Sequence, residues 1–161
     1  YPDFNRIIPT ENRLDIPVNS NKLLSAVKRA SVVTTDGSKL VKCSFEEKKL
    51  VLTADVSEIG KSNVSIDVAY DEEKFEIGFN PDFIVDVLNV VSNESIIMKF
   101  TDQSKAGVVK EIFSDNDDYF IHVIMPINLE ENTENPDSTD NLENNENGEN
   151  IEYNENIEEY R

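Results

Sequence analysis

The sequence is poor in the residues on which many active sites depend. It contains one cysteine, Cys43, one histidine, His122, and no tryptophan. A single cysteine excludes an internal disulfide framework and any zinc site built from several cysteines. A single histidine argues against most hydrolase triads and against His-rich metal sites. This cysteine content suits a reducing cytoplasm, where we expect the protein to reside.

Long apolar runs are also absent. The runs that exist span only a handful of residues, far short of the roughly 18–20 that cross a bilayer. No basic and then apolar leader stands at the start, so we expect neither a membrane partner nor secretion. The chain begins at Tyr1 rather than at methionine, and we therefore expect a fragment or a processed product of a longer protein.

Negative charge dominates the composition and is unevenly distributed. The 161 residues include 33 Asp and Glu against 15 Lys and Arg, a formal net charge of −18, which argues against simple adhesion to nucleic acid or acidic membrane. Residues 130–161 carry 12 of the acidic residues but only one basic residue, Arg161. Because this Asn- and Glu-rich segment cannot bury enough apolar surface to fold, we expect a disordered acidic tail over 130–161.

Hydrophobic periodicity predicts the order β-α-β-β-β-β-α-β-β-β in the remaining residues. Strands are expected over 14–18, 39–45, 49–54, 62–69, 74–79, 95–101, 107–113 and 119–126, with helices over about 20–33 and 81–91. Two helices serve about eight strands, so we expect an α+β fold in which both helices pack on one face of a mostly antiparallel sheet. There is no βαβ alternation and no Gly-rich phosphate loop, which argues against Rossmann and P-loop enzymes.

Four stretches of sequence, in this order and spacing, resemble one family. They are YPDFNRIIP (1–9), NSNKLLSAVKRASVVT (19–34), FEIGFNPDFIVDVLNVV (75–91) and VIMPINL (123–129). Together they resemble the bacterial sliding clamp, the beta subunit of DNA polymerase III, from the end of its second domain through its third. The resemblance implies the DNA-clamp (processivity) fold, with a linker from the preceding domain over 1–10, a third clamp domain over 11–129 and the tail after it.

The resemblance also implies a function without catalysis or cofactors. Full-length clamps are ring-shaped homodimers that encircle double-stranded DNA without reading its sequence and confer processivity on the replicative polymerase. Their partners are the DNA polymerase III alpha subunit, the clamp loader and repair polymerases, which dock through short Leu/Phe motifs. The alternative, from a different functional class, is a stand-alone acidic protein-interaction module with a clamp-like fold that no longer forms a ring.

A peptide-binding cleft is the first surface that the resemblance implies. Position by position, its expected residues are Pro2, Arg6 and Ile7 in the linker, Ser104 and Ala106 near the cleft, and Val123, Ile124, Met125, Pro126 and Ile127 in the last strand. In a strand, Val123, Met125 and Ile127 would share one face, and Met125 offers an adaptable apolar contact. The alternative is ordinary core packing against the linker.

A DNA-facing side of the first helix is the second implied surface. Lys22 and Arg29 lie on its polar side, with Lys28 on the flank. Such cations contact phosphate oxygens in a salt-sensitive and sequence-independent way. The ordinary alternative is a solvated helix face.

Other features point to structure rather than chemistry. We expect residues 115–118 to form a polar hairpin tip rather than a calcium loop, His122 to lie at the surface, and Cys43 to be inert packing. Asn5 and Asn128 stand where the family usually places basic residues. Family members generally end near Leu129, and the extra tail begins beside the expected cleft, where it could repel acidic partners or DNA.

Overall fold

The computed structural model describes residues 13–35, 39–112 and 119–129. The expected linker over 1–10, the hairpin tip over 115–118 and the tail over 130–161 lie outside the described residues. Neither α-helix in the described part is long and apolar enough to cross a bilayer.

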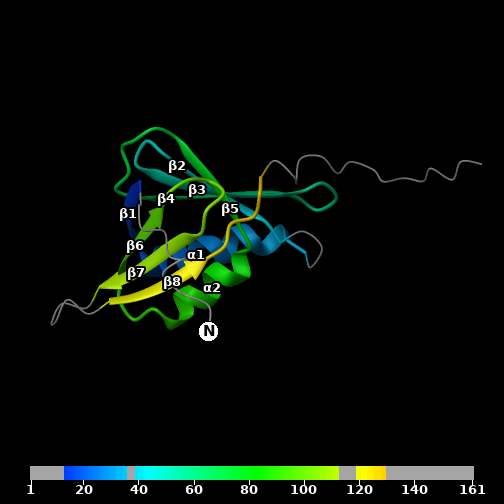
Figure 1. Cartoon of the computed structure of the whole chain (residues 1–161). Helices are drawn as coiled ribbons and strands as arrows, with labels where there is room; N and C mark the ends of the chain where they lie inside the picture. The colour runs from blue at the N-terminus through cyan, green and yellow to red at the C-terminus, as the bar shows by residue number, and fades with distance from the viewer. Residues whose placement is uncertain (1–12, 36–38, 113–118, 130–161) are drawn as a thin grey trace, which may run out of the picture.

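The described residues form eight strands, two α-helices and one short 3-10 helix (Figure 1). In chain order these are β1 (Leu14–Asn19), α1 (Ser20–Ala30), η2 (Ser31–Val33), β2 (Val41–Glu46), β3 (Lys49–Val56), β4 (Gly60–Asp67), β5 (Phe75–Phe79), α2 (Pro81–Val90), β6 (Ser95–Phe100), β7 (Gly107–Ile112) and β8 (Tyr119–Ile124). The predicted order of elements and the α+β class are confirmed.

The strands in the described part divide into two four-stranded antiparallel sheets rather than one large sheet. Their orders are β1-β6-β7-β8 and β4-β3-β2-β5. Hydrophobic alternation identifies a strand and its buried face, but it does not identify the pairing partner. β1 pairs with β6, with Leu14 opposite Phe100, and β5 pairs with β2, with Phe79 opposite Val41.

The described elements form two units with the same order of one strand, one helix and three strands. β1-α1-β2-β3-β4 and β5-α2-β6-β7-β8 have the same order, and the first strand of each unit pairs with the second strand of the other. Both helices begin at equivalent asparagines, because Asn19 accepts a hydrogen bond from the Lys22 N–H and Asn80 accepts one from the Asp82 N–H. These N-caps satisfy amide groups that a helix start leaves unpaired.

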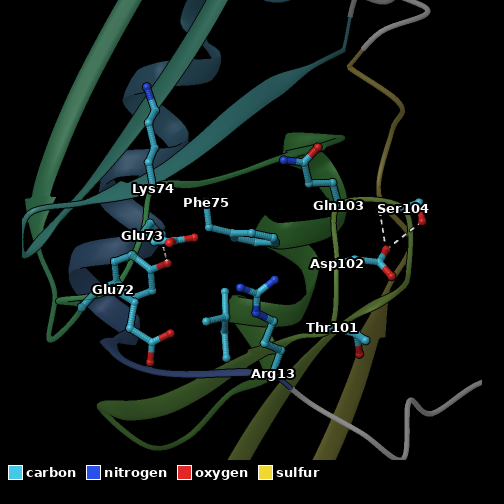
Figure 2. A pocket seen from close by; sticks show the side chains of 11 residues that line it. Arg13, Glu72, Glu73, Lys74, Phe75, Thr101, Asp102, Gln103 and Ser104 are labelled. Atoms are coloured by element: carbon cyan, nitrogen blue, oxygen red, sulfur yellow. Dashed lines mark hydrogen bonds between the residues drawn. The ribbon is translucent and has the colours of Figure 1, made fainter.

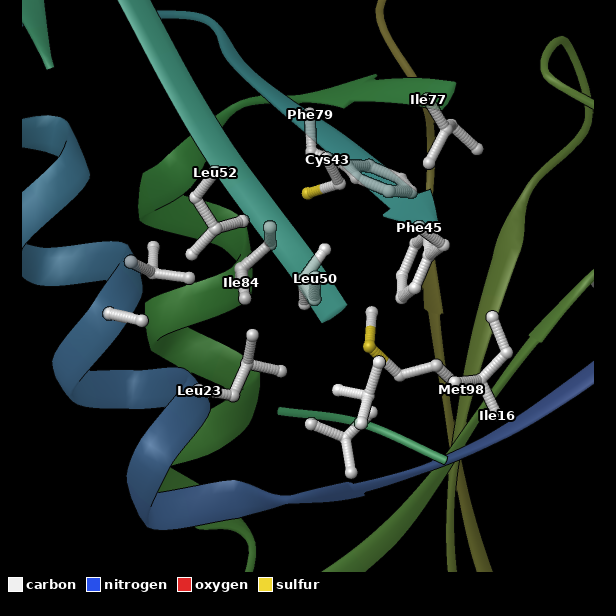
Figure 3. Packing of buried hydrophobic residues seen from close by; sticks show 14 of the residues in the cluster. Ile16, Leu23, Cys43, Phe45, Leu50, Leu52, Ile77, Phe79, Ile84 and Met98 are labelled. Carbon is white, nitrogen blue, oxygen red and sulfur yellow. The ribbon is translucent and has the colours of Figure 1, made fainter. Parts of the chain in front are cut away.

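One hydrophobic core joins both sheets and both helices. Leu23 of α1 and Ile84 of α2 lie among Leu50, Phe45 and Met98 from the two sheets (Figure 3). The two helices pack against each other, and each contributes its buried side chains to this core. α1 also packs on β3 and β4. The sheets therefore hold the outer faces of α1 and α2 in fixed positions.

Cys43 belongs to this core, as the sequence predicts. It is buried, and burial raises the pKa of its thiol to about 12. The thiol therefore stays protonated near neutral pH and is a poor nucleophile.

Candidate functional site

The last strand leaves its sheet earlier than the sequence predicts. We expected a strand over 119–126, but β8 ends at Ile124. Pro126 has no N–H to donate to a strand ladder, and the backbone N–H of Ile127 donates instead to the carbonyl oxygen of Gly78 across 2.8 Å. The segment after β8 therefore crosses from one sheet to β5 of the other.

This crossing segment exposes a methionine. The side chain of Met125 is 60% exposed, whereas Ile124 is only 4% exposed and belongs to the hydrophobic core. Val123, Pro126 and Ile127 are half-buried. The expected shared strand face of Val123, Met125 and Ile127 does not form as one continuous strand, because the ladder stops at Ile124. Met125 is the apolar contact that the segment offers to solvent.

A close approach at Gly78 holds the segment in place. A Cβ atom built at Gly78 would lie 2.7 Å from the Leu129 Cδ2 atom, 2.9 Å from the Ile127 carbonyl oxygen and 2.9 Å from the Leu40 Cδ1 atom. Real side chains do not tolerate such distances from backbone atoms. Glycine at 78 is therefore what lets residues 127–129 lie directly on β5.

The β6–β7 loop lies beside the same crossing. Gly107 pairs with Ile124, so Ala106 lies beside the end of β8. Asp102 orders this loop by accepting hydrogen bonds from the Ser104 hydroxyl, the Ser104 N–H and the Lys105 N–H. These bonds, led by the Ser104 hydroxyl, lower the pKa of Asp102 to about 2. Ser104 is exposed, but Ala106 is buried, so Ala106 supports the surface rather than offering a contact.

Phe83 is an exposed aromatic residue in the first turn of α2. Its side chain is 53% exposed, while Ile84 and Leu88 are buried. Because β5 leads through Asn80 into α2, the Gly78–Ile127 bridge brings the first turn of α2 close to the crossing segment. The sequence signal that could have identified Phe83 is that this helix has more apolar residues than its buried face, formed by Pro81, Ile84 and Leu88, requires.

A polar hollow of about 710 Å³ lies on the other side of the Thr101–Ser104 loop (Figure 2). Its walls are that loop, the Tyr70–Phe75 segment and the start of β1, where Arg13 points into the space. Ser104 is its single residue from the expected cleft. Residues 123–127 do not line it, so this hollow is separate from the exposed Met125 and the residues beside it.

The three expected DNA-facing cations share one exposed surface on α1. Lys22, Lys28 and Arg29 are all exposed. A shallow hollow of about 390 Å³ runs along the same side, lined by Asn21, Leu24, Ser25, Lys28, Arg29 and Val32. On α2, the exposed polar residues are Asp82, Asp86 and Asn89, so the positive charge lies on α1.

His122 lies in a strand ladder rather than in a cluster of reactive groups. His122 is half-buried and lies opposite Val109 in the β7–β8 ladder. The expectation of a surface position is therefore met only in part. Within the described ranges, no group of three or more His, Cys, Asp or Glu side chains could hold a metal ion. The expected cleft residues Pro2, Arg6 and Ile7 lie outside those ranges.

Comparison with protein families settles the relationship of this chain. The family model described as DNA polymerase III beta subunit, C-terminal domain, matches residues 5–128. The chain belongs to this family. Residues 129–161 lie beyond the matched stretch.

Curated and solved beta clamps agree with this assignment. The chain is 31% identical over 132 residues to a beta sliding clamp of Chlamydia pneumoniae, covering 82% of this chain and 35% of the relative. It is 28% identical over 129 residues to the Escherichia coli K12 beta sliding clamp, covering 80% of this chain and 34% of that protein.

Among crystal structures, the Pseudomonas aeruginosa DNA polymerase III subunit beta matches with a TM-score of 0.73 and 26% identity, over 80% of this chain and 35% of that one. The Bacillus subtilis sliding clamp matches with a TM-score of 0.71 and 27% identity, over 80% of this chain and 34% of that one. The chain therefore spans about a third of the length of these clamp relatives.

Proposed function

We propose that this chain is the third domain of a sliding clamp. The full-length protein would form a homodimeric ring around duplex DNA and tether the replicative polymerase. The observation that carries this proposal is the match of residues 5–128 to the C-terminal domain of the beta subunit. The role is topological and non-catalytic, needs no cofactor and is performed in the cytoplasm.

Two strand edges support a ring rather than a stand-alone interaction module. β4 and β8 are the last strands of the two repeated units, and each lies at the end of its described sheet. An end strand presents unpaired backbone groups that favour pairing with another strand. A domain within a ring needs a neighbour on each side. We assign β8 to the preceding domain and β4, with the exposed Ile59 beside it, to the partner subunit.

The Met125 surface supports docking of partner peptides. It consists of the exposed Met125 and the half-buried residues beside it, Val123, Pro126 and Ile127, and we propose that the exposed Phe83 and the ordered Ser104 loop extend it. A flexible thioether and an aromatic ring suit the Leu and Phe side chains of varied partners. Pro2, Arg6 and Ile7 complete the proposed cleft from the linker side. We assign to it the polymerase alpha subunit, the clamp loader and repair polymerases.

The α1 surface supports loose contact with DNA. Lys22, Lys28 and Arg29 are exposed on one side of a helix that the core holds rigidly. Such contacts weaken as salt rises, because binding releases condensed counterions from the duplex. They carry no sequence information, so the ring would remain able to slide.

A peptide titration tests the docking role. Fluorescence anisotropy of a labelled Gln-Leu-x-Leu-Phe peptide would be compared for the unchanged chain, Met125→Asp and Val90→Asp. Val90 is the matched control, because its side chain is 65% exposed against 60% for Met125 and it lies at the far end of α2. We expect saturable binding that Met125→Asp weakens at least tenfold and Val90→Asp leaves unchanged.

Equal losses in both variants, or no saturable binding, would contradict the docking role. The same titration with griselimycin, to which a Bartonella birtlesii relative is bound in its crystal structure, provides a second ligand.

A further inference from the structure

The cations of α1 differ from most others in the described part of the chain because no carboxylate pairs with them there. Ion pairs occupy seven lysines of the described sheets and loops, which are Lys39, Lys42, Lys48, Lys61, Lys74, Lys99 and Lys105. Among the residues that the structure describes, Lys22 and Lys28 have no such pair, and the Arg29 Nε–H donates to the Ser25 carbonyl oxygen across 3.4 Å. In a protein of net charge −18, a basic surface without counter-ions indicates an anionic partner.

The start of α1 strengthens this positive surface. Its first turn contains no acidic residue and carries Lys22. The start of α2, by contrast, carries Asp82. A cation at the positive end of a helix dipole destabilises the helix. Residues that conflict with local stability in this way are expected where function requires them.

The hollow along α1 is lined by apolar as well as cationic side chains. Val32 is 79% exposed, Leu24 is half-buried, and Lys28 and Arg29 flank them. Phosphate oxygens would pair with the cations but would leave the side chains of Val32 and Leu24 exposed to water. A ligand with both acidic and apolar side chains matches the surface more completely.

The chain's own carboxy-terminal segment has this chemistry. Residues 130–161 combine 12 acidic residues with scattered apolar ones, Leu142, Ile151, Tyr153, Ile157 and Tyr160. The segment lies beyond the family match and follows Leu129, whose side chain lies against Gly78. A flexible chain of this length has a root-mean-square span of about 30 Å, comparable to the diameter of a domain of this size.

We propose that residues 130–161 bind intramolecularly to the α1 groove, which we define as the hollow lined by Leu24, Lys28, Arg29 and Val32 together with the exposed Lys22 near the start of the same helix. The tether supplies a local concentration of the order of millimolar, so individually weak contacts suffice. If the α1 surface contacts duplex DNA, as in the proposed function, the DNA must displace the tail from that surface. Only this consequence rests on the proposed function. The contact itself is independent of DNA and of ring closure.

A spin label in the tail locates this contact in the full chain. Because Cys43 is buried and protonated, Asn154→Cys provides a second thiol that a nitroxide reagent modifies selectively. We expect paramagnetic broadening of backbone amides to concentrate on residues 21–32 at about 20 mM salt. Broadening should fall strongly at about 500 mM salt, where the screening length is only a few Å.

Two triple variants with the same change in net charge test the location. Lys22→Gln, Lys28→Gln and Arg29→Gln together should abolish the broadening of α1. Lys48→Gln, Lys49→Gln and Lys105→Gln, exposed cations outside α1, should leave it unchanged. Broadening spread over the sheets, centred on Met125, or insensitive to the α1 triple overturns the proposal. No DNA or peptide is present, so failure of the clamp role would leave this result unaffected.

Discussion

The backbone N–H of Ile127 donates to the carbonyl oxygen of Gly78 across 2.8 Å, and this bond ties the end of the described chain to the opposite sheet. Without it, the residues after β8 would have no ladder to follow, since Pro126 interrupts the pairing. The bond fixes Met125 at the turn between the two sheets, where its side chain is exposed.

Gly78→Ala tests whether this close approach positions the proposed cleft. The added Cβ would lie within 3.0 Å of Leu129, Ile127 and Leu40 atoms, so residues 127–129 must move away from β5. We expect a loss of about 1–3 kcal/mol in unfolding free energy, measured by urea denaturation. Affinity for the Leu-Phe peptide should also fall at least threefold. Unchanged peptide affinity in a folded variant would contradict the positioning role.

Glu111→Ala tests a buried carboxylate that connects the two helices. Glu111 is 1% exposed, and its Oε1 atom accepts from the N–H groups of Ser92 and Asn93, each across 2.7 Å. Ser92 and Asn93 belong to the loop that follows α2, and the Asn93 carbonyl oxygen accepts a hydrogen bond from the Ser20 hydroxyl. This loop therefore joins the end of α2 to the start of α1. Two buried N–H groups without partners would cost about 2–4 kcal/mol.

Glu111→Gln is the matched control, because it retains one carbonyl oxygen as an acceptor. We expect it to cost about 1 kcal/mol. Hydrogen exchange at Ser20–Lys22 should accelerate in Glu111→Ala and change little in Glu111→Gln. Equal unfolding free energies for the two variants would show that the acceptor is unimportant.

The β2–β3 turn should become more stable with different residues. Glu47 and Lys48 both have positive φ angles, 46° and 64°, which suit Asn and Gly in a two-residue hairpin turn. The Lys48 N–H donates a hydrogen bond to the Tyr70 carbonyl oxygen, and the Lys48 carbonyl oxygen accepts one from the Val68 N–H. Both bonds use backbone atoms only, so the substitutions leave them in place. We expect Glu47→Asn with Lys48→Gly to raise the unfolding free energy by about 1 kcal/mol. A decrease on thermal or urea unfolding would contradict this.

The Asp102 carboxylate should remain charged at pH values well below the usual pKa of an aspartate side chain. Its pKa of about 2, against 3.8 for a free carboxyl, follows from hydrogen bonds led by the Ser104 hydroxyl. A lowered pKa means that the carboxylate stabilises the fold fully above about pH 3.8, and that this contribution disappears as pH falls through about 2. Ser104→Ala should raise the midpoint of the Asp102 carboxyl in an NMR titration. An unchanged midpoint in that variant would contradict the assigned cause.

The elements of this fold could be predicted because each is encoded locally. Asn80, Pro81 and Asp82 mark the start of α2, and alternation along β1 identifies its buried face. The division into two sheets could not be predicted, because pairing of β1 with β6 depends on contacts far apart in the sequence. Alternation likewise extended β8 to Pro126, although the ladder ends where the proline removes a donor.

The site was predictable only where resemblance supplied a position. Met125 and the α1 cations lie at the surface, but their binding roles stay predictions, and the sequence did not reveal that Ile124 and Ala106 are buried. Phe83 was missed because helical periodicity does not distinguish the edge of an apolar stripe from its centre. The lack of ion pairs on α1 within the described ranges became visible only in the structure, where most lysines of the sheets and loops have carboxylate partners.

The most direct test of the clamp account is a map of where a partner peptide binds. Isotope-labelled chain would be titrated with the Leu-Phe peptide while backbone amide shifts are followed by NMR. The account predicts saturable shifts centred on residues 123–129, extending to Ser104 and the first turn of α2. Shifts confined to the α1 groove, the polar hollow around Arg13 or the edge of β4, or no shifts at all, would contradict it.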